Sequence, residues 1–127
     1  MTSAILQRGL LSLLLLCAAV MPARSEPPPQ AQREIEQLIQ ALGASGCHFQ
    51  RNGKWYPAAD AQAHLRRKYD YLRKRDLVAS AEQFIERAGT ESSMSGKPYQ
   101  VRCAGQAAVS SADWLRARLS AIRHARP

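Results

Sequence analysis

The sequence predicts an α+β domain in which about four helices cover a small three-stranded antiparallel sheet. Apolar residues recur at helical spacing in several segments, an Asn-Gly pair separates two short alternating segments, and a third alternating segment lies further along the chain. A sheet of three strands cannot stand alone, so the helices must supply most of the core. We expect the order α-β-β-α-α-β-α in one domain over residues 33–124.

The first helix is expected from about Ala31 to Gly43, which is placed to cap its C-terminus. Its apolar residues recur at i, i+3, i+4 and i+7, namely Ile35, Leu38, Ile39 and Leu42. Residues 47–51 and 54–56 are expected to form a hairpin, because Asn52-Gly53 supplies the positive φ angles that a two-residue turn requires.

A second helix is expected over residues 58–75, with one narrow apolar stripe made of Ala61, Leu65, Tyr69 and Leu72. Ser80 and Gln83 fit a capping box at the start of a short third helix. After a polar loop, residues 99–103 alternate as a strand does, and Ser110 or Ser111 then caps a final helix.

The first 25 of the 127 residues have the pattern of a cleavable export signal. Arg8 precedes an apolar stretch over residues 9–20, and Ala23 and Ser25 are the small residues that flank a signal peptidase cut. The stretch is too short to span a bilayer, so we expect a cut after Ser25 and no transmembrane span in the mature protein. Residues 26–32 are Pro-rich and are expected to form a disordered tether.

The chain is strongly basic, with a formal net charge of +8. Loss of Arg8 and Arg24 with the signal removes two positive charges and leaves about +6. Positive charge often indicates nucleic acid binding, but export separates the chain from nucleic acid. We expect an anionic envelope component or an acidic protein as partner instead, and the sequence gives no reason to expect a cofactor.

Two cysteines, Cys47 and Cys103, remain after cleavage, and each lies in a segment that is expected to be a strand. An even number of cysteines in an oxidising compartment favours a disulfide. The alternative is a pair of free thiols, but no CxxC redox motif is present.

The best candidate binding loop is polar and rich in hydroxyl groups, and it comprises Ser92, Ser93, Ser95, Gly96, Lys97 and Tyr99. Such a loop forms a nest of backbone N–H groups that binds a carboxylate or phosphate. The alternative interpretation is a serine-rich turn that satisfies its own backbone, with Gly96 supplying an unusual φ angle.

His64 and Lys68 lie one helical turn apart and are adjacent candidates for the same site. No residue is assigned as catalytic, so we expect a small non-enzymatic binding or envelope-associated module. The alternative function is a hydrolase of unrecognised type, in which His64 is the general base and Ser93 or Ser95 the nucleophile. No metal site is expected, because the three histidines are scattered without ligand spacing.

Four basic residues gather on another face of the second helix: Arg66, Arg67, Arg73 and Lys74. The simplest interpretation is a solvated helix face, and the more specific one is a docking surface for an anionic polymer.

Several segments resemble a known family in the same order along the chain: residues 51–53, then Ala61 with His64-Leu65 and Lys68, then residues 81–85 and 92–99, and finally Trp114-Leu115. They are similar to the YfeK-like exported bacterial proteins, catalogued as domain of unknown function 5329. The resemblance covers roughly residues 34–123, and its most specific part is the SSMSGKPY run at residues 92–99. It implies a Gram-negative periplasmic protein and carries no reaction or catalytic residue.

Overall fold

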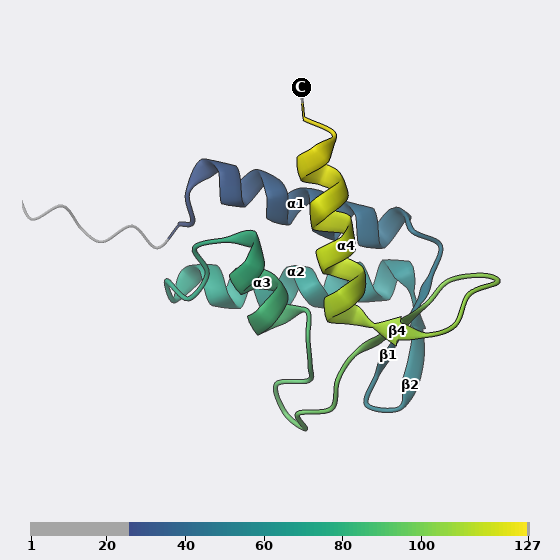
Figure 1. The fold of residues 1–127 in the computed structure, drawn as a ribbon. Coiled ribbons are helices and arrows are strands. Elements are labelled where there is room, and N and C mark those ends of the chain that lie inside the picture. The colour runs from purple at the N-terminus through teal and green to yellow at the C-terminus, as the bar shows by residue number, and fades with distance from the viewer. Residues whose placement is uncertain (1–25, 127) are drawn as a thin grey trace, which may run out of the picture.

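The computed structural model describes residues 26–126, which form four helices and a four-stranded antiparallel sheet in the order α-β-β-α-α-β-β-α (Figure 1). The elements are α1 (Pro29–Ala44), β1 (His48–Arg51), β2 (Lys54–Pro57), α2 (Ala58–Lys74), α3 (Ala81–Ala88), β3 (Gln100–Arg102), β4 (Val109–Ser110) and α4 (Ser111–His124). The predicted α+β class is confirmed. The expected export signal lies outside the described residues.

The fourth strand was not expected, and it changes the three-stranded sheet into a four-stranded one. β4 pairs Val109 with Val101 and Ser110 with Gln100. Its two residues are too few to produce the alternation that predicts a strand. The strand therefore follows from the pairing with β3, which the local sequence does not reveal.

The expected tether is also partly ordered. α1 begins at Pro29, so the last four residues of the 26–32 segment are helical. Proline is well tolerated at the start of a helix, where its missing N–H would have no intrahelical partner. Pro27 is buried, and the Gln32 side-chain amide donates a hydrogen bond of 2.7 Å to its carbonyl oxygen.

The strand order is β2-β1-β3-β4, and the β1–β2 turn is the predicted one. Asn52 and Gly53 have φ angles of 52° and 79°. Phe49 pairs with Tyr56 on one side and with Val101 on the other. Because side chains alternate along a strand, Arg51 shares the sheet face of Phe49.

The predicted disulfide joins Cys47 and Cys103, whose Cα atoms are 4.3 Å apart. His48 and Arg102 are partners in the β1–β3 ladder, so the two cysteines lie one residue beyond the paired strands. The bond thus connects the adjacent ends of β1 and β3.

α1 packs against α2, α3 and α4, and the sheet lies beside α2 at one end of the helical layer (Figure 1). The largest fully buried apolar side chains are Ile35, Leu38, Ile39, Leu42, Phe84, Ile85, Val101 and Leu115. Gly43 lies inside α1 and not at its C-terminal cap. A Cβ atom there would meet the amide end of the flexible Gln62 side chain, which would have to move.

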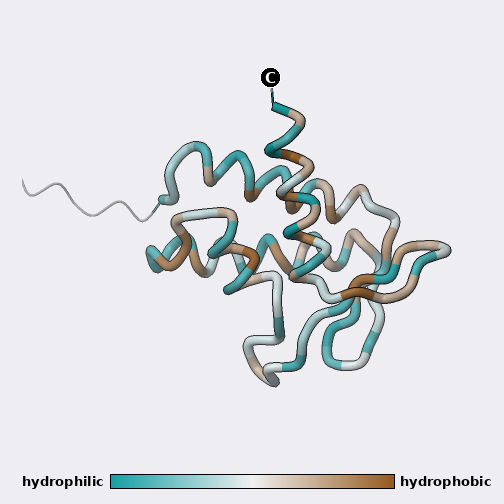
Figure 2. Tube along the Cα trace, in the orientation of Figure 1, coloured by the Kyte–Doolittle hydropathy of each residue, from teal (hydrophilic) through white to brown (hydrophobic). Residues whose placement is uncertain are grey.

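Apolar and polar segments alternate along each helix, as Figure 2 shows. Within residues 26–126, no helix combines the length and the apolar character that crossing a membrane requires. The third and fourth helices begin at the predicted caps. The hydroxyl of Ser80 accepts from the Gln83 backbone N–H, and that of Ser110 accepts from Asp113.

Candidate functional site

Four polar side chains meet where α2 packs against the sheet: Arg51, His64, Lys68 and Tyr99. We refer to them as the His64 cluster. His64 and Lys68 are four residues apart on α2 and so lie on one face of the helix. Arg51 ends β1, and Tyr99 immediately precedes β3. The fold therefore brings together three segments that are distant in the sequence.

The hydrogen bonds of the cluster determine the tautomer of His64. A guanidinium N–H of Arg51 lies 3.1 Å from Nδ1 of His64, and Arg is always a donor, so Nδ1 accepts. The proton of the neutral ring is then on Nε2, which donates to the Tyr99 hydroxyl oxygen at 3.0 Å. Both ring nitrogens of His64 are occupied within the cluster.

The Tyr99 hydroxyl receives a second hydrogen bond, from the Lys68 ammonium at 3.1 Å. With both oxygen lone pairs accepting, the hydroxyl hydrogen of Tyr99 remains to be donated. Lys68 also donates to the carbonyl oxygen of Glu91 at 3.0 Å, which leaves one of its three N–H groups. The cluster therefore presents donors and no acceptor to an incoming group.

Burial and positive charge change the pKa values in this cluster. Burial lowers the pKa of His64 to about 4, helped by the charges of Arg51, Lys68 and Arg67. Burial likewise lowers the pKa of Lys68 to about 8, although the Glu91 carboxylate opposes this. Burial raises the pKa of the Tyr99 hydroxyl, which keeps its proton. At neutral pH the cluster holds a neutral imidazole, a phenol and two cations.

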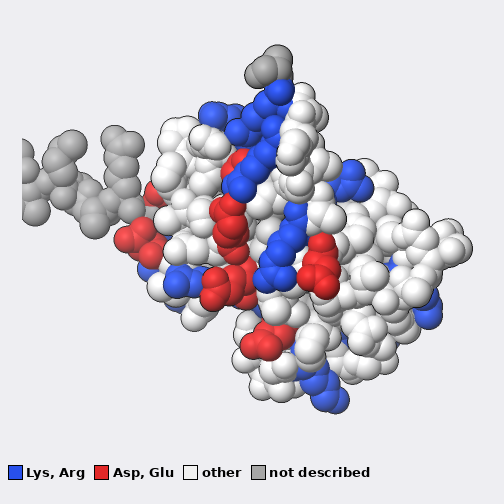
Figure 3. Space-filling view, in the orientation of Figure 1, with Lys and Arg blue, Asp and Glu red and all other residues white. Residues whose placement is uncertain are grey.

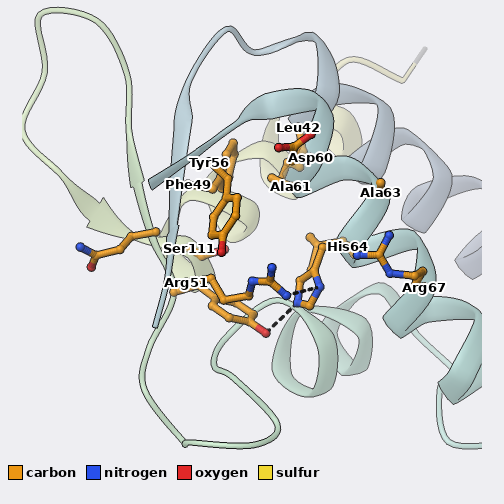
Figure 4. Close-up of a pocket in the computed structure, with 13 residues that line it drawn as sticks. Leu42, Phe49, Arg51, Tyr56, Asp60, Ala61, Ala63, His64, Arg67 and Ser111 are labelled. Atoms are coloured by element: carbon orange, nitrogen blue, oxygen red, sulfur yellow. Dashed lines mark hydrogen bonds between the residues drawn. The ribbon is translucent and has the colours of Figure 1, made fainter. Parts of the chain in front are cut away.

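A hollow of about 230 Å³ opens beside the cluster. Figure 4 shows Arg51 and His64 side by side at the hollow, which Tyr56, Phe49 and Ala61 also line. Its walls are mainly apolar and include Leu42 and Leu65. A small apolar hollow with a few convergent polar groups at one side is the usual form of a ligand site.

Arg51 and Arg67 line this hollow, and Lys68 lies beside it in the His64 cluster. Within residues 26–126, Arg51, Lys68 and Arg67 form no ion pair, whereas Arg66 and Arg123 do. One carboxylate, that of the exposed Asp60, lines the hollow. Cations that face a cavity without a partner provide an electrostatic attraction for an anion.

The serine-rich loop has the geometry of the self-satisfying turn. The buried hydroxyl of Ser92 accepts from the backbone N–H groups of Met94 and Ser95, each at 3.3 Å. Gly96, with a φ angle of 71°, donates its N–H to the Ser92 carbonyl oxygen. Lys97 donates its N–H to the Ser95 hydroxyl. These N–H groups are already used inside the loop, so Tyr99 is the residue of this set that enters the cluster.

Within residues 26–126, no hydrogen bond joins His64 to Ser93 or Ser95, the residues of the alternative hydrolase function. His64 forms hydrogen bonds with Arg51 and Tyr99, and the Ser95 hydroxyl donates to the side-chain oxygen of Asn52 in the hairpin turn. Ser93 lines a second hollow together with His64, but no hydrogen bond joins the two. Among residues 26–126, no group of three or more His, Cys, Asp or Glu side chains is placed to hold a metal ion.

The four residues of the expected basic face have different environments. Arg66 makes a bidentate pair with Glu36, at 2.9 and 3.0 Å, and Arg73 pairs with Asp70 and Glu26. Lys74 is exposed, and Arg67 lines the hollow beside His64. The face is therefore not a continuous stripe of free cations.

Arg51 and Tyr56 are site residues that the sequence analysis missed. Arg51 lies two residues after the buried Phe49, and Tyr56 is the cross-strand partner of Phe49. Hairpin register alone places both on the core-facing side. The signal was present in the Asn-Gly turn, which specifies that register.

The comparisons with known proteins identify a family and name no activity. The model of a "Family of unknown function (DUF5329)" matches residues 29–123, which are 95 of the 127 residues. The chain is also 33% identical over 91 residues to the "Uncharacterized protein YfeK" of Salmonella typhimurium, and the alignment covers 67% of this chain and 74% of that protein. No solved structure matches the chain significantly.

Proposed function

Because the chain belongs to the DUF5329 family, for which no function is known, we propose its role from its own geometry. It is a small, non-enzymatic periplasmic binding module. The His64 cluster receives the acidic group of a small ligand, and the adjoining hollow receives the apolar part. The observation that carries this proposal is the absence of any ion pair, within the described residues, for the cations that face the hollow.

The donor pattern supports an anionic group in particular. Because Arg51 donates to Nδ1 of His64, the ring proton is on Nε2 and is donated to the Tyr99 hydroxyl oxygen. The hydroxyl hydrogen of Tyr99 therefore has no acceptor among these residues. Lys68 keeps one N–H group, and Arg51 keeps more than one. A carboxylate or phosphate oxygen accepts from such groups in charge-assisted hydrogen bonds, which are stronger than neutral ones.

The shape of the hollow supports a ligand that is not a bare ion. Its walls include Leu42, Phe49 and Leu65, all of which belong to the buried core. Apolar walls contribute about 25 cal/mol for each Å² of apolar surface that they remove from water. An alkyl or aryl acid therefore fits better than inorganic phosphate.

The periplasmic location is supported by the pattern of residues 1–25 and by the disulfide between Cys47 and Cys103. Disulfides form and persist in oxidising compartments such as the bacterial periplasm. We expect the exported chain to begin at Glu26, so its basic character is available to anionic molecules of the envelope.

The test is an NMR titration of the protein, purified after expression of the full chain, with hexanoate and with hexanol. Hexanoate should shift the signals of Arg51, His64 and Tyr99, and hexanol should bind more weakly because it lacks the charge. Arg51→Gln should weaken hexanoate binding by roughly tenfold or more, since a hydrogen bond to a charged group contributes about 1.5–3 kcal/mol.

Arg33→Gln is the matched control, because Arg33 is exposed on α1 and its loss changes the net charge by the same amount. This variant should bind hexanoate as the wild type does. The proposal is wrong if hexanoate leaves the cluster signals unchanged, or if Arg33→Gln and Arg51→Gln weaken binding equally.

A further inference from the structure

A second hollow, of about 440 Å³, adjoins the first. His64 and Arg67 line both hollows, so the two meet along these side chains. Beyond them the second hollow is lined by Lys68, Tyr71, Leu72, Arg87 and Ser93. It therefore lies between α2 and the segment that includes the end of α3 and the serine-rich loop.

This second hollow is basic and has no acidic lining residue. Arg87 donates one N–H to the carbonyl oxygen of Leu77 and, in the described part of the chain, has no carboxylate partner. The Ser93 side chain is exposed and makes no hydrogen bond within residues 26–126. Glu91 acts on Lys68 through its charge, but it lines neither hollow. No carboxylate that lines this hollow would therefore compete with a second acidic group for Arg87.

We infer that the ligand is a diacid, in which one acidic group contacts Arg51 and Tyr99 and a second contacts Arg87. An apolar linker joins the two groups and passes His64 and Arg67. This inference rests on the proposed function, because it assumes that the first acidic group binds at the His64 cluster. It adds a second contact point and restricts the ligand to molecules with two separated acidic groups.

Charge complementarity favours this ligand over a monoacid with a longer apolar chain. Both hollows have apolar surface, but the second is lined by three cations, Arg67, Lys68 and Arg87, and by no carboxylate. An apolar tail placed there would cover these cations and remove their water without giving them partners, which is unfavourable. A second acidic group supplies the partners.

The experiment measures dissociation constants for the α,ω-dicarboxylates from succinate to sebacate and for the monocarboxylates of equal length. At one linker length, the diacid should bind at least about tenfold more tightly than the matching monoacid. A symmetrical diacid gains a factor of two from having two equivalent ends, so only a larger gain supports a second contact.

Variants assign the gain to Arg87. Arg87→Gln should remove the diacid advantage and leave monoacid affinity unchanged, and Arg87→Lys should restore part of it because it keeps the charge. Arg33→Gln should change neither affinity, and circular dichroism of each variant shows whether its fold is intact.

The possible failures are distinguishable. If diacids bind within twofold of monoacids at every length, or if Arg87→Gln leaves a larger diacid gain intact, the inference is wrong and the proposed function stands. If no monocarboxylate binds at the His64 cluster, the proposed function is wrong, and the inference that depends on it fails as well.

Discussion

Two charged clusters in this protein differ in how their charges are balanced. The first, which we call the Glu34 cluster, comprises Glu34, Glu82, Arg123 and Arg126 and joins α1, α3 and α4. The second is the His64 cluster, which joins α2 to the sheet. In the Glu34 cluster each charge has a partner of opposite sign, whereas the His64 cluster has cations and neutral groups.

Glu34 shows what a paired cluster does. Its side chain is 3% exposed, and it accepts two hydrogen bonds from Arg123, at 2.8 and 3.1 Å, and one from Arg126 at 2.8 Å. Arg123 also pairs with Glu82. Figure 3 shows basic side chains along α4 beside a group of acidic ones. All the charge of this cluster is used within the protein.

The difference indicates a division of roles. A paired, buried carboxylate fixes three helices relative to one another, and removing one partner leaves the others uncompensated. Unpaired cations beside a hollow weaken the fold through mutual repulsion, and they retain the capacity to bind an anion. The first cluster should therefore control stability, and the second should control binding.

The largest expected effect comes from reducing the disulfide, which connects β1 and β3 at the ends opposite to Arg51 and Tyr99. Opening a link between residues 56 positions apart should lower the free energy of unfolding by roughly 4 kcal/mol. The melting temperature should fall by roughly 4–8 °C for each kcal/mol. Hydrogen exchange should rise more at Phe49 and Val101 than in α1, because the bond holds the sheet and not the Glu34 cluster.

The control for this prediction is the intact mass of the protein purified from the periplasm. It should correspond to a chain that begins at Glu26 and lacks the two thiol hydrogens. A mass that retains residues 1–25 would contradict export. A Cys47→Ser/Cys103→Ser variant that melts with the wild type would contradict the stabilising role of the bond.

The second effect comes from Glu34→Gln, which should lower the free energy of unfolding at neutral pH by about 2 kcal/mol, since charge-assisted hydrogen bonds are lost. Hydrogen bonds from Arg123 hold the pKa of Glu34 below its usual value of 4.5. Ionised Glu34 therefore stabilises the protein above about pH 4.5, and this contribution is lost as the pH falls through the lowered pKa. Urea denaturation near pH 7 and near pH 3 should show a smaller acid loss in the variant.

Glu86→Gln provides the comparison for this measurement. Glu86 is exposed on α3 and has no ion pair within residues 26–126, so its replacement should change stability by less than about 0.5 kcal/mol. If the two variants are equally stable, the Glu34 cluster does not have the stabilising role that its geometry indicates.

Sequence analysis identified the parts of the fold that depend on local patterns. The spacing of Ile35, Leu38 and Leu42 predicted the first helix, and Asn52-Gly53 predicted the hairpin. The two-residue β4 has no such pattern. α1 also begins earlier than its apolar residues indicate, because Pro29 is compatible with a first helical turn.

The two clusters were predictable to different extents. The i, i+4 spacing of His64 and Lys68 placed them on one face, and Tyr99 was included through its loop. The contact of Arg51 with His64 depends on how α2 packs against β1, which no local pattern encodes. Glu34 and Arg123 are 89 residues apart in the sequence, so no local pattern predicts their pairing either.

The smallest expected effect on stability, and the most direct test of the unpaired charges, comes from Arg51→Gln. Arg51 has no ion pair in the described part of the chain and donates one hydrogen bond to His64, so its loss should change the free energy of unfolding at neutral pH by no more than about 1 kcal/mol. The pKa of His64, however, should rise from about 4 towards its usual value of 6.5. The rise should be partial, since burial is the larger cause and Lys68 and Arg67 remain.

An NMR titration of the His64 ring measures this pKa. The lowered pKa also makes the stability of the protein depend on pH. Because the folded pKa is lowered, the unfolded chain binds a proton between about pH 4 and 6.5 that the folded chain does not. His64 therefore destabilises the fold as the pH falls from 6.5 to 4, mostly above the range in which Glu34 loses its charge. Arg51→Gln should narrow this window, and a bound anion should do the same by favouring the protonated ring. A pKa that stays near 4 in both cases would mean that burial alone lowers it, and the contrast between paired and unpaired clusters would lose its electrostatic basis.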